Sequence, residues 1–410
     1  MKVSVTNKYQ KNSVLTKALL YLFAVSMALG NWNPLLQGGD SEETATSLST
    51  FIIILLVPYL LFEANKANWW KNKYTTPLFQ FFVIIFISSL LNASTISVSF
   101  FVYYTKLLVG ILLCSLLPVY FVREPRLIYI SLLIYSVACA FVGTAIFMGY
   151  GEQYMSIHNG RLWLFGENPN TTSGRYGIAV IVLFYLIFNN PLQLKANHYF
   201  LLPFIFPLMS LIVMSGSRGS LLITGMSILL YAYLVNKKNS MQGLAIFSVV
   251  IIPLAVYTVN QMFDSDYSML ERLTRSANEE GGNEIRDRLF WASYDIFLHN
   301  PIIGMGTVDF KRTMLQNYFM DHTAHNMYIY ILATSGIVGF TPFAVFLFRL
   351  FKKAYSRVKY SFLPLLLLFF ICFIAYKTGG ILTYLFMWYI FSIIISAVEI
   401  KNGQLISVEK

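Results

Sequence analysis

An arginine flanked by glycine and serine lies in a short turn between two apolar runs of the sequence. The turn reads Ser-Gly-Ser-Arg-Gly-Ser at 215–220, and its arginine is Arg218. An arginine this close to a hydrocarbon core is costly to insert, and such residues usually face a water-filled cavity or an anionic partner. The flanking glycines and serines allow backbone and ligand to approach closely. We therefore expect Arg218 to bind an anion, with a simple interaction with lipid headgroups as the alternative.

Two further arginines, Arg286 and Arg288, lie in a long hydrophilic stretch later in the chain. Their guanidinium groups are forked donors suited to phosphate or carboxylate. The alternative is that one of them pairs with Glu284 or Asp287. Apolar residues recur here at helical spacing, which predicts a helix at the membrane interface over 286–299. These apolar residues are Leu289, Ala292, Ile296 and Phe297.

Two histidines, His322 and His325, and the neighbouring Asn326 come directly before another apolar run. Histidine has the unperturbed pKa nearest neutrality among the side chains, so it can act as a general base. We expect this role of His325, and we expect His322 and Asn326 to contact the substrate. The alternative is an interfacial polar residue with no part in chemistry.

The hydrophilic segment 150–175 mixes cationic side chains with an aromatic residue and turn residues. Arg161, Trp163 and Arg175 could form a surface that faces a sugar or a phosphate. A structural turn is the alternative, because Asn-Pro at 168–169 is a strong breaker of regular structure.

The composition indicates that membrane-spanning helices position all of these residues. The chain of 410 residues is 57% hydrophobic and 12% charged, with a mean hydropathy of +0.61. A soluble domain would need more charged surface, whereas a protein in lipid can be apolar all round. The apolar runs approach the roughly 20 residues that cross a bilayer. This predicts an all-α integral membrane protein.

We predict about twelve transmembrane helices in one polytopic domain over 1–410, with outer loops at 150–175 and 260–326. The sequence shows no internal repeat within this domain. The predicted helices cover residues 14–30, 48–63, 77–93, 97–121, 127–149, 176–189, 199–214, 220–235, 243–259, 327–350, 361–376 and 380–399.

The basic residues predict the orientation of these helices. If the N-terminus is cytoplasmic, the short outer turns contain only Arg218 and Lys377, and both termini lie in the cytoplasm. All the candidate site residues then lie on the outer face. The short inner segments hold Lys66, Lys71, Lys73, Arg123, Arg126, Lys195, Lys237, Lys238, Lys352, Lys353, Arg357 and Lys359.

The net charge of +11 does not indicate nucleic-acid binding, because the basic residues are spread over loops that orient helices. The cysteines, Cys114, Cys139 and Cys372, all lie in apolar runs and show neither metal-ligand spacing nor a disulfide framework. We therefore expect no metal site and no cofactor.

Taken together, these segments resemble the O-antigen ligase and polymerase superfamily of bacterial surface-polysaccharide assembly. The resemblance rests on the Ser-x-Ser-Arg-Gly turn, and on Arg286 about fifteen residues before a Pro-x-x-Gly-x-Gly element that begins at Pro301. It also rests on the pair His325-Asn326 leading into a helix with Gly-x-x-Gly at 336–339, and on Asn-Pro-Asn at 168–170. It is strongest over about 150–345.

The resemblance implies a metal-independent glycosyltransferase of GT-C-like membrane architecture, acting on the periplasmic side of the bacterial inner membrane. The donor would be a glycan on undecaprenyl diphosphate, and the acceptor lipid A–core or another glycan. Carried over to this chain, Arg218 and Arg286 would bind the diphosphate and His325 would be the general base. Arg288 remains an alternative to Arg286, because the aromatic residue that follows is displaced from its usual place in the family.

Two alternatives to O-antigen ligation stay open. A polymerase would use the same donor and the same basic and histidine residues to extend a chain with repeat units. A flippase or exporter for lipid-linked sugars would need no catalysis, but the chain lacks the repeated halves common in transporters.

Overall fold

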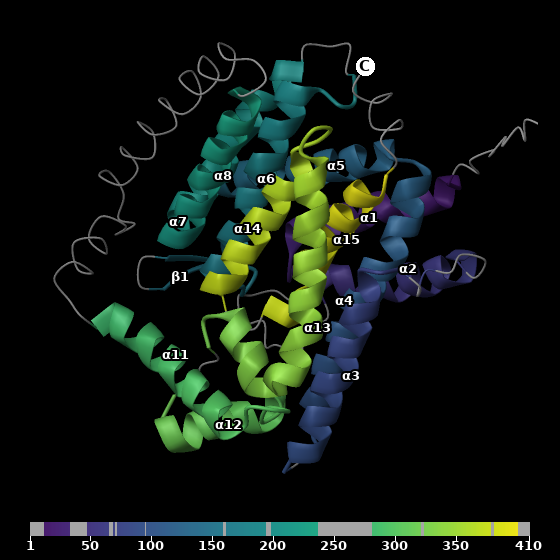
Figure 1. The fold of residues 1–410 in the computed structure, drawn as a ribbon. Helices are drawn as coiled ribbons and strands as arrows, with labels where there is room; N and C mark the ends of the chain where they lie inside the picture. Colours follow the sequence, from purple (N-terminus) through teal and green to yellow (C-terminus); the bar gives the residue numbers. More distant parts are fainter. Residues whose placement is uncertain are drawn as a thin grey trace, which may run out of the picture.

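A computed structural model describes most of the chain. The described residues are 12–32, 47–64, 69, 72–94, 96–158, 161–193, 198–236, 281–320, 324–378 and 381–400. They form an almost entirely helical structure (Figure 1). The α-helices are α1 (Val14–Leu29), α2 (Leu48–Ala64), α3 (Thr75–Asn92), α4 (Val98–Arg123), α5 (Arg126–Phe147), α6 (Pro169–Asn189), α7 (Ile205–Met214), α8 (Arg218–Asn236), α11 (Gly281–His299), α12 (Thr307–Tyr318), α13 (Met327–Arg357), α14 (Leu363–Lys377) and α15 (Leu385–Glu399).

The length and apolar composition of the helices confirm the predicted class, an all-α membrane protein. In the described part of the chain, six helices are long and apolar enough to cross a membrane, namely α3, α4, α5, α6, α8 and α13. Five shorter apolar helices accompany them, among them α1, α2, α14 and α15. The predicted helix over 243–259 lies outside the described residues.

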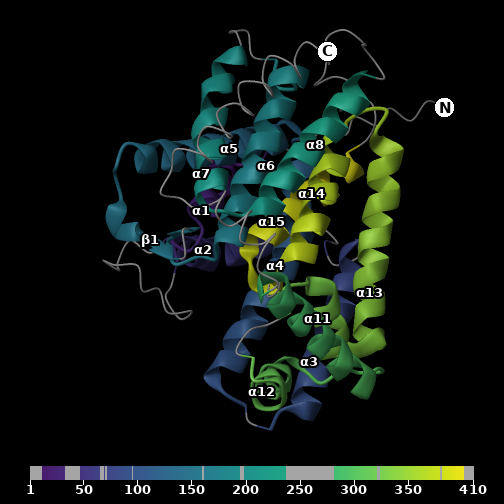
Figure 2. The same cartoon turned by 90° about the vertical axis from the view of Figure 1, so that its left-hand side faces the viewer.

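Helix α6 forms the centre of the bundle and is packed by α5, α7, α8 and α14. In its most apolar stretch, 94% of the residues are buried inside the protein. A second close packing joins α4 to α15, where a side chain on Gly110 would collide with the buried ring of Trp388. Figure 2 shows α11 and α12 together at one end of the molecule, which places them beyond the main bundle.

Helix α6 begins at Pro169, seven residues before the predicted start at 176. The predicted start was wrong because Asn168-Pro169 was interpreted as a break in regular structure, whereas these two residues begin the helix. The side chain of Asn168 caps the helix by accepting a hydrogen bond from the Asn170 amide, at 2.9 Å. Proline suits the first helical position because its φ is already helical and it has no amide to satisfy. The last seven residues of the predicted outer loop are therefore helical.

A small antiparallel hairpin lies in the same segment and was not predicted. Strands β1 (Met155–His158) and β2 (Arg161–Leu164) pair so that Met155 faces Leu164. In β2, Leu162 and Leu164 are buried, whereas Arg161 and Trp163 are half-buried on the other face. This alternation directs Arg161 away from the apolar side of the hairpin.

The predicted helix over 286–299 is present as part of α11, whose buried residues include Leu289, Ala292 and Ile296. Its position at the membrane interface stays a prediction. Helix α12 was not predicted, because only Phe310 and Met314 of its residues are buried.

The long helix α13 is broken at Gly336, which has a φ of 61° and a ψ of −169°. The break interrupts the internal hydrogen bonds of the helix, and the loop between α11 and α12 replaces them. Amides of this loop, at Met305 and Gly306, donate to carbonyls before the break, each at 2.9 Å. Past the break, the amide of Ile337 donates to the Pro301 carbonyl at 2.9 Å. Backbone groups buried at a broken helix must find such partners.

Glycine is required at this junction because the two backbones touch. A Cβ on Gly304 would overlap the backbone at Ser335, and a Cβ on Gly336 would overlap the Ile302 carbonyl. Both glycines also have positive φ values, which side chains disfavour. The Pro-x-x-Gly-x-Gly element and the first glycine of Gly-x-x-Gly therefore form a single joint.

Candidate functional site

The turn that carries Arg218 is held by a network of buried serines. Ser217 Oγ donates to Asn170 Oδ1 at 3.0 Å, and Ser173 Oγ donates to Ser220 Oγ at 2.7 Å. These bonds attach the turn to the first residues of α6. Ser217 and Ser220 are buried, whereas Arg218 is exposed. The serines of the motif thus fix the backbone from which a single cationic side chain projects.

Arg161 completes this network from the hairpin. Its Nη2 donates to Asn170 Oδ1 at 2.7 Å, and its Nε donates to the Ser215 carbonyl at 3.1 Å. Asn170 Oδ1 therefore accepts from both Arg161 and Ser217. The structure thus attaches Arg161 to the turn that carries Arg218. The predicted contact of Arg161 with substrate stays a prediction.

Arg286 approaches Arg218 although almost seventy residues separate them in sequence. The side chain of Arg286 is exposed, but neighbouring protein atoms remove part of its hydration, and this desolvation and the positive charge of Arg218 both lower its pKa below the ordinary value. An arginine remains protonated at neutral pH even so, because its ordinary pKa lies far above 7. Two like charges repel, so an anion between them would relieve the repulsion.

Arg288 lies about 200° around α11 from Arg286, given about 100° per helical residue. It is exposed, and it forms no ion pair with any residue that the structure describes. Arg286 is close enough to Arg218 for the charge of Arg218 to lower its pKa, and Arg288 projects from the opposite side of α11. This favours Arg286 over Arg288 as the partner of Arg218.

Lys377 adds a third cation that the sequence analysis did not select. The carbons Cγ and Cδ of its side chain lie 3.6 Å from the position that a Cβ on Gly219 would take. Its side chain is exposed, and Lys377 is the last residue of α14. Its position in a short outer turn was the available signal, since Arg218 was the only other basic residue predicted in such turns.

His325 is half-buried and lies two residues before the start of α13. Asn326 begins this helix, because its Oδ1 accepts from the Tyr328 amide at 2.9 Å and from the Ile329 amide at 3.2 Å. The hydroxyl of Tyr328 donates to the Cys372 carbonyl at 3.0 Å. Cys372 lies on the same helix as Lys377 and only five residues before it. The start of α13 is thereby fixed beside the helix that carries Lys377.

Arg175 occupies a different environment, the interior of the bundle. It is only 2% exposed, and its Nη2 lies 2.5 Å from Glu167 Oε2. Its guanidinium contacts Gly30 at the end of α1 and lies 5.8 Å from the centre of the Phe386 ring. Neither Nε nor Nη1 has a hydrogen-bond partner among the described residues. The geometry ties three helices together; the predicted substrate contact of Arg175 stays a prediction.

His322, also a predicted ligand, lies outside the described residues. In the part of the chain that the structure describes, no group of three histidine, cysteine, aspartate or glutamate residues could hold a metal ion.

The fold and the site define a class, a polytopic membrane protein with converging cations and a histidine at the start of a helix. The comparison with protein families then supplies the family: the model described as O-antigen ligase matches residues 203–344. This match supports the resemblance to the O-antigen ligase and polymerase superfamily that the sequence motifs indicated. The matched segment includes Arg218, Arg286 and His325. Comparisons with curated proteins and with solved structures find no match.

Proposed function

We propose that this protein is a membrane glycosyltransferase that moves a glycan from undecaprenyl diphosphate to an acceptor hydroxyl. The family supports an enzyme of the ligase or polymerase type. We assign it to O-antigen ligation onto lipid A–core, in the bacterial inner membrane with both termini in the cytoplasm. The active site then faces the periplasm, and the partners are the lipid-linked donor, the acceptor and the surrounding lipids.

The proposal is carried by the effect of the Arg218 charge on Arg286, together with the family match, which spans both residues. Two guanidinium groups that repel each other at a membrane surface are suited to a ligand with two negative phosphates. A diphosphate is already a good leaving group, so the enzyme has only to stabilise its departing charge. Fixed cations near a low-dielectric boundary do this without reorganisation.

The proposed reaction is a single displacement at the anomeric carbon of the donor. His325 removes the proton of the acceptor hydroxyl as its oxygen forms a bond to this carbon. The bond between the carbon and the diphosphate oxygen breaks, and the electron pair leaves with the diphosphate. Arg218 and Arg286 neutralise that charge. The products are the new glycoside, undecaprenyl diphosphate and one proton, first held by His325. We propose no metal ion in this step, because the cations take its place.

Arg161 and Asn326 enter this proposal as positioning residues. Arg161 holds the turn of Arg218 through Asn170, and Asn326 caps the helix that follows His325. Arg288 and His322 stay further candidates for contact with the bound donor.

The proposal is tested by replacing each central residue in the native host. His325→Ala should lower the transfer rate by about 10²–10⁴-fold, and Arg218→Gln or Arg286→Gln by at least about 100-fold. Immunoblots confirm insertion, gels display the surface polysaccharide, and lipid extracts reveal the carrier-linked glycan. Matched controls are His299→Ala and Arg312→Gln, since both residues are exposed on the outer helices α11 and α12. They should leave the transfer rate unchanged.

The pattern of products separates the candidate functions. Loss of long chains from lipid A–core with accumulation on the carrier supports ligation. A single repeat unit on the core assigns polymerisation instead. An unchanged ladder in His325→Ala overturns the general base, and if Arg218→Gln alone abolishes surface glycan, transport replaces transfer.

A further inference from the structure

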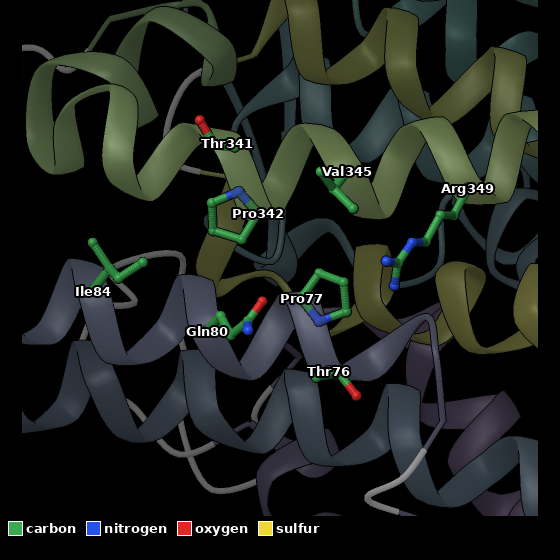
Figure 3. A pocket seen from close by; sticks show the side chains of 8 residues that line it. All are labelled: Thr76, Pro77, Gln80, Ile84, Thr341, Pro342, Val345 and Arg349. Carbon is green, nitrogen blue, oxygen red and sulfur yellow. The ribbon is translucent and has the colours of Figure 1, made fainter.

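An elongated groove lies between α3 and α13, two of the helices that can cross a membrane (Figure 3). Its volume is about 390 Å³. Ile84, Pro342 and Val345 line part of its wall. Within a bilayer, such an apolar groove between helices accommodates a hydrocarbon chain.

Polar side chains also line this groove, at positions where a lipid-facing helix is usually apolar. Thr76 and Gln80 extend from α3, and Thr341 from α13, and all three are exposed. The hydroxyls of Thr76 and Thr341 donate to the Asn72 and Ile337 carbonyls, at 3.0 and 2.7 Å. A polar group facing hydrocarbon without a partner costs free energy, so it is the Gln80 amide that most favours a ligand with polar atoms. The glycerol and ester groups of a phospholipid meet this requirement directly below its headgroup.

Arg349 closes one end of the groove with a fixed positive charge. Its Nη1 donates to the Lys73 carbonyl at 2.6 Å, which holds the guanidinium beside α3. Figure 3 shows its side chain directed from α13 toward Pro77 across the groove. Among the described residues Arg349 has no ion-pair partner, whereas Lys73 is paired with Glu399 at 3.2 Å. Its charge is therefore available to an anion.

Further basic residues surround this end of α13. Lys352 is exposed and Lys353 is half-buried, within four residues of Arg349. In the proposed orientation this end faces the cytoplasm, where basic pockets between helices bind anionic lipid headgroups.

We propose that the groove between α3 and α13 binds one anionic glycerophospholipid of the inner leaflet. Its phosphate contacts Arg349, its glycerol region lies against Thr76 and Gln80, and one acyl chain follows Ile84 and Val345. This site is separate from the candidate transfer site, because Arg349 and His325 lie toward opposite ends of α13.

The test uses the full-length protein purified in detergent. Native mass spectrometry and thermal unfolding are measured with added phosphatidylglycerol, with phosphatidylcholine and with inorganic phosphate. We expect adducts and a rise in the unfolding temperature with phosphatidylglycerol alone. Arg349→Gln should remove at least half of that rise, and Arg349→Lys should keep most of it. Arg126→Gln is the matched control, since Arg126 is exposed at the start of α5.

A second variant keeps the test decisive if Arg349→Gln does not fold. Thr341→Phe fills the groove from an exposed position and leaves Arg349 in place. It should abolish the phosphatidylglycerol adduct. Equal stabilisation by phosphatidylcholine, by phosphate alone, or of both variants to the wild-type extent overturns the proposal.

Discussion

Single charged residues account for most of the chemistry that the candidate site can perform. Arg218, Arg286 and Lys377 come from three helices that are distant in sequence, and each side chain is exposed. Exposure allows these cations to contact a ligand, whereas the buried serines near Arg218 form hydrogen bonds within the protein. Each of these three residues therefore contributes its positive charge to the candidate site independently of the other two.

We predict that Lys377 contributes to binding of the donor. Lys377→Gln removes a cation beside Gly219 and should lower kcat/KM at least about tenfold, equivalent to about 1.4 kcal/mol. The measurement is transfer from a purified carrier-linked glycan. Lys311→Gln, at an exposed lysine of α12, is the control. A kcat/KM equal to that of the wild type would exclude Lys377 from the site.

At the scale of elements, the joint between the α11–α12 loop and the broken helix α13 connects two parts of the candidate site. Helix α11 carries Arg286, and α13 follows His325. Four backbone hydrogen bonds cross the joint, two on each side of Gly336. Because these bonds fix the loop against α13, the joint sets where Arg286 can lie relative to His325.

We predict that Gly336→Ala destabilises the protein by about 1–3 kcal/mol, the usual effect of overpacking, and also lowers transfer. The added methyl group would overlap the Ile302 carbonyl and oppose the positive φ. The unfolding temperature in detergent and the transfer rate report the two effects. Gly225→Ala is the matched control, because nothing lies within 4 Å of a Cβ at that position. If the Gly336 variant matched the Gly225 variant in stability, the joint would not be under steric constraint.

At the scale of the whole molecule, the buried pair Arg175–Glu167 joins the first helix to the centre of the bundle. Glu167 Oε1 also accepts from the Asn31 amide at 2.8 Å, directly after α1. A buried pair contributes little compared with an apolar pair of the same size. Removing only one partner, however, leaves an uncompensated buried charge.

We predict that Glu167→Ala destabilises the fold by about 3–5 kcal/mol. The double variant Glu167→Leu with Arg175→Met should recover most of the lost stability and, if the pair is purely structural, the transfer activity as well. Unfolding temperature and transfer rate are measured on the same preparations. A stable but inactive double variant would show instead that Arg175 contacts the substrate.

The sequence by itself determined the class of the protein and selected the candidate site residues. Hydropathy locates apolar helices because a bilayer requires long uninterrupted runs. The resemblance to the O-antigen ligase family was also visible, since Arg218, Arg286 and His325 lie in short motifs with a fixed order. Local signals of this kind need no knowledge of which helices touch.

Only the tertiary structure decided which residues share a surface. The hairpin carrying Arg161, the burial of Arg175 and the position of Lys377 beside Gly219 all depend on contacts between distant segments. Contacts of this kind produce no periodic pattern of residue types in the sequence. The glycines at 304, 306 and 336 looked like separate motifs, because backbone-to-backbone contact across thirty residues becomes visible only when the chain is folded.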